Sequence, residues 1–70
     1  MEPVKQFAAN VRAVRKSREL SQEALARAAG LHRTEVSLLE RGLREPRLET
    51  IVRLARALKT APADLLRGVR

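Results

Sequence analysis

Apolar residues recur along this chain at spacings of three and four positions, the pattern of helices that each bury one face. The first predicted helix runs from about Pro3 to Arg18, with Phe7, Val11 and Val14 on one face. Strand signals are absent, because β-branched residues are few while Ala and Leu number eleven each. The pattern therefore predicts an all-α fold.

Two further helices are predicted in the last third of the chain. One runs from about Leu48 to Leu58, and its inward positions are Leu48, Ile51, Leu54, Ala55 and Leu58. The other is short, from about Pro62 to Leu66, where proline suits the first turn. The segment Leu43–Arg47 contains Pro46 and is predicted to be a loop.

The most informative stretch is Ser21–Gly42, which is predicted to form two short helices joined by a tight turn at Gly30. Ala26, next to the inward Leu25, is small enough for two steeply crossing helices to approach closely. Gly30 takes a left-handed conformation at no steric cost, so it ends the first helix. This is the layout of a helix-turn-helix, whose second helix enters the DNA major groove.

Three apolar residues complete this motif. Leu31 is predicted to plug the turn into the core, and Val36 and Leu39 form the buried stripe of the second short helix. The alternative is an ordinary helical hairpin with no DNA-reading role. Together with the flanking helices, the motif predicts five helices in all.

Length and composition limit the possible functions. Seventy residues make one small domain, 1–70, near the lower limit for folding alone. The chain has no Cys and a single histidine, His32, so no disulfide, thiolate metal site or zinc site is expected. No nucleophile–base pair or carboxylate pair can be assembled. We therefore expect neither an enzyme nor a cofactor.

The charge favours a polyanionic partner. Fifteen basic residues face eight acidic ones, for a net charge of +7 and a pI near 11.5, although a basic surface also simply solubilises a protein. The basic excess lies in residues 1–20 and 43–70, so it flanks the motif, as expected for phosphate contacts around a reading helix. No signal peptide or apolar run of membrane length is seen, so we expect a cytoplasmic protein without a membrane partner.

The apolar residues at the C-terminus have two possible roles. Leu65, Leu66 and Val69 are more apolar than a simple tail requires. They either complete the small core or form a dimer seam, and the sequence does not decide between these.

Several motifs together resemble the phage repressor and Cro (XRE) family. They are Arg15–Lys16, LSQEALA (Leu20–Ala26), AGL (Ala29–Leu31), LLERG (Leu38–Gly42), EPRLETIVRLARAL (Glu45–Leu58) and DLL (Asp64–Leu66). The resemblance implies a compact lambda-repressor-like fold of five helices that acts as a homodimer on a two-fold symmetric DNA operator. It extends to small stand-alone bacterial regulators such as restriction–modification controllers, for which no small-molecule effector is expected.

The resemblance also assigns roles to residues. It places Arg33, Thr34, Ser37 and Leu38 on the base-reading face of the third helix, although Leu38 is equally read as a half-buried apolar residue. It implies phosphate contacts from Gln22, His32, Arg41, Arg44 and Arg47. It further implies a structural ion pair between Arg15 and Glu40 that locks the recognition helix to the first helix.

The chain departs from the family at four turn and cap positions. His32 and Arg47 stand where many relatives have a Ser or Thr N-cap, and we hypothesise that capping gave way to phosphate contact there. Glu19 and Lys59 replace glycines common after the first and fourth helices. The leading function is a sequence-specific transcriptional regulator. The alternative is a protein-interaction module on the same fold, such as an antitoxin or a polymerase-binding protein.

Overall fold

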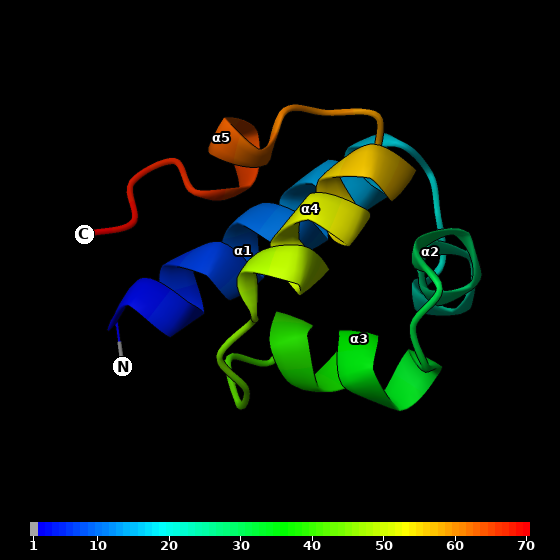
Figure 1. Cartoon of the computed structure of the whole chain (residues 1–70), viewed down its shortest axis with the longest axis horizontal. Helices are drawn as coiled ribbons and strands as arrows, with labels where there is room; N and C mark the ends of the chain where they lie inside the picture. Colours follow the sequence, from blue (N-terminus) through cyan, green and yellow to red (C-terminus); the bar gives the residue numbers. More distant parts are fainter. Residues whose placement is uncertain (1) are drawn as a thin grey trace.

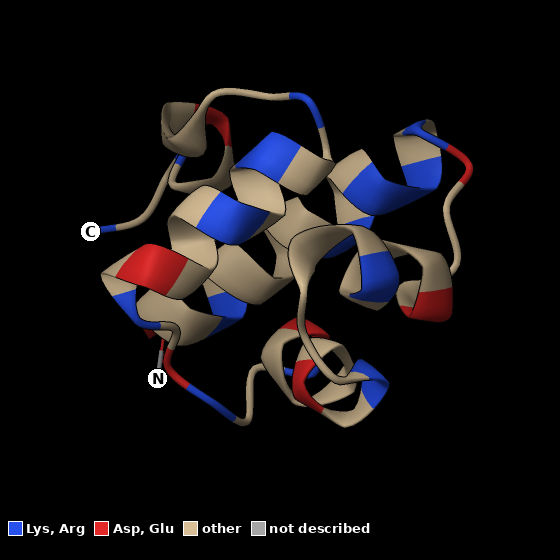
Figure 2. Cartoon of the chain, turned by 45° about the vertical axis from the view of Figure 1, so that its right-hand side comes forward, with Lys and Arg blue, Asp and Glu red and all other residues tan. Residues whose placement is uncertain are grey.

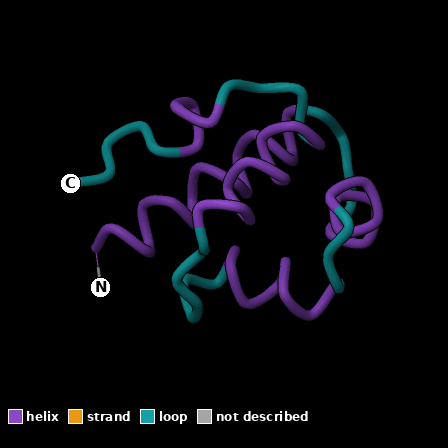
Figure 3. Tube along the Cα trace, in the orientation of Figure 1, coloured by secondary structure: helices purple, strands orange, loops and turns teal. Residues whose placement is uncertain are grey.

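The computed structural model describes residues 2–70 and confirms an all-α fold, with helices joined by short loops (Figures 1 and 3). The helices are α1 (Glu2–Ser17), α2 (Gln22–Ala29), α3 (Arg33–Glu40), α4 (Leu48–Ala57) and α5 (Pro62–Leu65). Each predicted helix is present, and the predicted ends of α1, α4 and α5 are within one residue of those observed. No helix within residues 2–70 is long and apolar enough to cross a membrane.

The core is formed where the helices converge. Helix α3 packs on α1 and α2, while α5 packs on α1 and α4, so α3 and α5 lie on opposite sides of α1 and α4 (Figure 1). The buried cluster consists of Phe7, Val11, Leu25, Ala26, Ala29, Val36, Leu39, Leu54, Ala55, Leu58 and Leu65. Leu31 and Val14 are partly buried against it. The apolar spacing of the sequence therefore identified the inward face of each helix.

The prediction was wrong for Leu48, which was expected to face inward. Its side chain is 76% exposed, whereas Leu54 and Leu58 on the same helix are buried. Side chains on a helix lean toward its N-terminus, so the side chain of the first residue of α4 points past the helix end. Leu48 is therefore a surface residue and not part of the core.

The ambiguity at the C-terminus is resolved for one residue. Leu65 is completely buried in the core cluster, so of its two possible roles it completes the core, and the dimer-interface alternative is wrong for this residue. Leu66 is 39% exposed and Val69 is half-buried. Asn10 holds this segment against α1 because its side-chain amide donates to the carbonyl oxygens of Leu65 at 2.9 Å and Arg67 at 2.8 Å.

Two turns contain residues in the left-handed region that are not glycine. Glu19 follows α1 with φ of 59° and Lys59 follows α4 with φ of 56°. The amide of Leu20 donates to the Arg15 carbonyl at 3.2 Å, and that of Thr60 donates to the Ala55 carbonyl at 2.9 Å. Both helices thus end in the hydrogen-bonded turn that usually takes glycine, and the two side chains are strained there.

Candidate nucleic-acid interface

Helix α2 is held at both ends by the residues around it. The Ser21 hydroxyl accepts a hydrogen bond from the Ala24 amide at 2.9 Å, a capping role that the sequence interpretation did not assign. Gly30 ends the helix with φ of 71°, as predicted, and the Leu31 amide donates to the Ala26 carbonyl at 2.9 Å. This glycine turn directs the chain from α2 into α3 within three residues.

Helix α3 presents one face to the core and the other to solvent. Val36 and Leu39 are completely buried, which anchors the helix against α1 and α2. On the other side Arg33 and Thr34 are exposed, and Ser37 is half-buried. Leu38 is also half-buried, so part of its side chain is accessible at the surface. The four residues predicted to read bases therefore all keep some solvent exposure.

The ends of α3 differ in how their backbone groups are satisfied. At the start, His32 occupies the N-cap position in extended backbone, but its side chain makes no capping hydrogen bond. At the end, Gly42 takes φ of 69°, and its amide donates to the Leu39 carbonyl at 3.1 Å. The Leu43 amide donates to the Leu38 carbonyl at 3.0 Å, which completes a Schellman turn. Arg41, at the C-cap, is exposed beside this turn.

The predicted ion pair between Arg15 and Glu40 is present and bidentate. Arg15 Nε donates to Glu40 Oε2 at 2.7 Å, and Nη2 donates to Oε1 at 3.0 Å. The Arg15 side chain is 11% exposed and that of Glu40 only 2%. Arg15 Nη1 also donates to the Leu20 carbonyl at 2.7 Å. Charge-assisted bonds in this fork geometry connect α1 to the end of α3.

Gln22 makes a contact that sequence reasoning missed. Its Nε2 donates to Glu40 Oε1 at 3.1 Å, so the same carboxylate holds both α1 and the first residue of α2. Gln22 and Arg33 also line one hollow of about 410 Å³ with Arg15, Ser21 and Glu23. A predicted phosphate contact and a predicted base contact therefore lie together. Gln22 and Glu40 are 18 positions apart, a separation at which local periodicity carries no signal.

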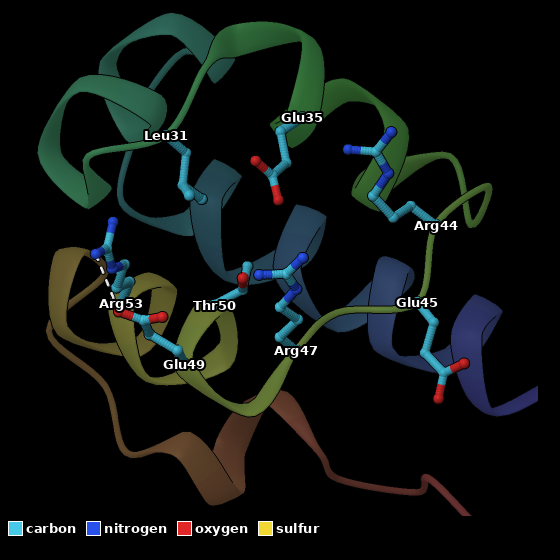
Figure 4. Close-up of a pocket in the computed structure, with 8 residues that line it drawn as sticks. All are labelled: Leu31, Glu35, Arg44, Glu45, Arg47, Glu49, Thr50 and Arg53. Atoms are coloured by element: carbon cyan, nitrogen blue, oxygen red, sulfur yellow. Dashed lines mark hydrogen bonds and ion pairs between the residues drawn. The ribbon is translucent and has the colours of Figure 1, made fainter.

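The loop between α3 and α4 carries two more of the predicted phosphate contacts, Arg44 and Arg47, and both are exposed. They line a hollow of about 400 Å³ between α3 and α4 (Figure 4). Its remaining lining residues are Leu31, Glu35, Glu45, Glu49, Thr50 and Arg53. Arg47 is the N-cap of α4 and makes no side-chain capping bond.

The charges in this hollow are mixed. Arg53, which sequence reasoning did not single out, pairs with Glu49 at 3.0 Å (Figure 4). It also donates weakly to the Gly30 carbonyl at 3.4 Å. Three arginines thus face three glutamates in the hollow, so it carries no net positive charge. Most of the net positive charge lies in the segments between and after the helices, where seven basic residues outnumber two acidic ones; the helices carry eight basic and six acidic residues (Figure 2).

Comparison with known proteins identifies the family of this chain. A model of the helix-turn-helix family HTH_3 matches residues 11–65, which include α2, the turn at Gly30 and α3. The chain belongs to this helix-turn-helix family. Within a helix-turn-helix domain the second helix of the motif enters the major groove, and α3 occupies that place. The domain indicates DNA binding, and the family is one of transcriptional regulators and not of enzymes.

Three similar proteins illustrate the relationship. Control protein C.SmaI from Serratia marcescens is 48% identical over 60 residues, covering 86% of this chain and 71% of that protein. The structure of the restriction-modification controller protein C.AhdI from Aeromonas hydrophila superposes with a TM-score of 0.91 at 38% identity, covering 93% of this chain and 98% of that one. The DNA-binding domain of the P22 C2 repressor has a TM-score of 0.84 at 34% identity, with coverages of 89% and 82%.

Proposed function

We propose that this helix-turn-helix protein is a sequence-specific transcriptional regulator that binds a two-fold symmetric operator as a homodimer. The observation that carries the proposal is the two-sided character of α3. Val36 and Leu39 fix its inner face in the core, while Arg33 and Thr34 on its outer face have no core contact to make. A rigid scaffold under an exposed polar face is what base reading requires.

The proposal divides the site residues by role. Arg33, Thr34, Ser37 and Leu38 read base edges, with Arg33 suited to the O6 and N7 atoms of guanine. Gln22, His32, Arg41, Arg44 and Arg47 contact phosphates and fix the register of the protein on the duplex. The Glu40 carboxylate holds the Gln22 amide in place, because it accepts a hydrogen bond from Gln22 Nε2.

The proposed dimer surface lies beside α5. Leu66 and Val69 line an apolar hollow of about 160 Å³ with Ile51 and Pro46, and its other lining residues are Pro3, Val4, Phe7 and Glu45. Burying such a surface against a second copy would add apolar contact to a domain whose own core is small. Dimer half-sites lie about one helical turn of DNA apart, near 34 Å.

The likeness to control protein C.SmaI and to the controller protein C.AhdI extends over most of this chain. It supports the narrower proposal that the protein regulates genes of a bacterial restriction–modification system.

Selection of bound duplexes from a random DNA library tests the proposal. We expect a two-fold symmetric consensus with half-sites about one helical turn apart. The Arg33→Gln variant, selected in parallel with the wild type, should remain folded but lose its base preference at one position of each half-site. Recovery of duplexes without any consensus would contradict sequence-specific regulation and would favour a protein partner.

A further inference from the structure

Helix α1 carries a stripe of basic residues along one face. Lys5, Arg12 and Lys16 follow one another at intervals of seven and four residues, so they share one side of the helix, with Ala9 between them. All three basic residues are exposed. The stripe spans twelve residues, and the eleven steps between Lys5 and Lys16 extend about 16 Å along the helix axis.

This stripe forms one wall of a groove. The groove has a volume of about 420 Å³ and is lined by Lys5, Ala8, Ala9, Arg12, Ala13, Lys16, Glu40, Arg41 and Gly42. Its second wall is the end of α3 and the turn after it. Small residues form the floor, and a Cβ at Gly42 would meet Lys5 Cγ at 3.2 Å. Larger side chains at these positions would fill the groove.

The groove is strongly positive. Among residues 2–70, the ion pairs of the protein involve Arg15, Arg53 and Arg67, so none of the four basic lining residues is neutralised by one. Glu40 is the single carboxylate in the lining, and its charge is already paired with Arg15. The groove therefore offers four cationic side chains to an anionic partner over a surface of nearly constant sign.

The position of the groove indicates which polyanion occupies it. Arg41 lines the groove and is itself a proposed phosphate contact. Glu40 in its lining accepts the hydrogen bond from Gln22, the proposed phosphate contact at the start of α2. The groove thus begins where the proposed path of the DNA backbone passes α3. An acidic protein segment would match the charge but would have no reason to lie on that path.

We propose that this groove binds the sugar–phosphate backbone of double-stranded DNA beside the recognition helix, through Lys5, Arg12 and Lys16. The proposal rests on the proposed DNA-binding function and adds a sequence-independent contact to it. Such contacts strengthen binding to every sequence equally and make it more sensitive to salt, because each neutralised phosphate releases counterions.

The test compares two variants with the same net charge. The groove variant is K5Q/R12Q/K16Q. The control variant, R56Q/K59Q/R70Q, removes three exposed basic residues that do not line the groove. Binding of each full chain to a random-sequence 30-base-pair duplex and to the selected consensus duplex is measured across a salt series. Far-UV circular dichroism checks that both variants are folded.

We expect the groove variant to bind both duplexes at least about tenfold more weakly, with the slope of log affinity against log salt reduced by about 3 per protomer. The base preference should not change, and the control should shift much less. Equal shifts in both variants would overturn the proposal in favour of overall charge. A groove variant with the affinity and salt slope of the wild type would also overturn the proposal. If the wild-type chain still bound the consensus duplex in that case, the proposed regulator function would stand. A wild-type chain that binds neither duplex would refute the proposed function itself.

Discussion

Removing Arg15 should destabilise the protein strongly. In Arg15→Met the Glu40 side chain, only 2% exposed, loses both guanidinium bonds and keeps only the bond from Gln22. Breaking a buried ion pair by removing one partner costs about 3–5 kcal/mol. Since the Arg15 side chain is 11% exposed, water can partly replace it, and we expect about 3 kcal/mol. A domain of this length has only about 4–10 kcal/mol of stability in total.

The other members of the mutant cycle should behave differently. In Glu40→Leu, Arg15 keeps its bond to the Leu20 carbonyl and its partial access to water, so we expect a loss of about 1–2 kcal/mol. The double variant replaces the pair by two apolar side chains and should lie within about 1 kcal/mol of the wild type. The two changes should therefore be coupled by about 3–6 kcal/mol.

Urea unfolding followed by far-UV circular dichroism measures all four proteins, provided that the denaturant slope is unchanged. Strictly additive losses would refute the reasoning, because they would mean that the two side chains stabilise the fold independently. The affinity for the consensus duplex gives a second, independent test. The double variant leaves Gln22 without its acceptor on Glu40, so its affinity for the consensus duplex should fall although its stability is retained.

Three further predictions concern caps, turns and pH. Replacing Glu19 or Lys59 by Gly should stabilise the fold by about 0.5 kcal/mol each in urea unfolding, because the relief of left-handed strain exceeds the added entropy of the unfolded chain; a loss of stability would contradict this. Arg47→Ser should raise stability by about 1 kcal/mol through a new N-cap while weakening DNA binding, and the hypothesis fails if both quantities move in the same direction. The hydrogen bond from the Thr60 hydroxyl, followed by that from the Ala61 amide, lowers the pKa of Asp64. Its contribution to stability is therefore present above the ordinary aspartate pKa of about 3.9 and is lost as the pH falls, so Asp64→Asn should show a smaller decrease in urea midpoint on acidification than the wild type.

Most of the fold could be predicted because it depends on local regularities. Helical spacing places Val11, Leu25 and Leu39 inward, and each of them is completely buried. Gly30 marks the turn, since few other residues adopt its φ of 71° without strain. The Leu48 error shows the limit of periodicity, which describes a helix face but not where along the helix the core ends.

The site was less predictable because its contacts join residues that are distant in the sequence. The Arg15–Glu40 pair was expected from the family resemblance, and no spacing rule links positions 25 residues apart. The bond from Gln22 to Glu40 was missed, since the family resemblance assigned the Gln22 amide to a DNA phosphate and no local pattern links positions 18 residues apart. The basic stripe on α1 has a clear period in the sequence, but only the folded chain shows that it faces Arg41 across a groove.

The cap positions connect stability to the proposed function. Helix α2 has a side-chain cap from Ser21, and α5 has one from Asp64, whose carboxylate accepts from the Ala61 amide at 3.2 Å. The N-cap residues of α3 and α4, His32 and Arg47, provide no such bond. Both uncapped helices start next to the surface proposed to face DNA, where a phosphate oxygen can accept from the free backbone amides. N-cap side chains are thus missing at the two helix starts where bound DNA can satisfy the backbone amides instead. DNA should therefore stabilise the starts of α3 and α4 more than those of α2 and α5.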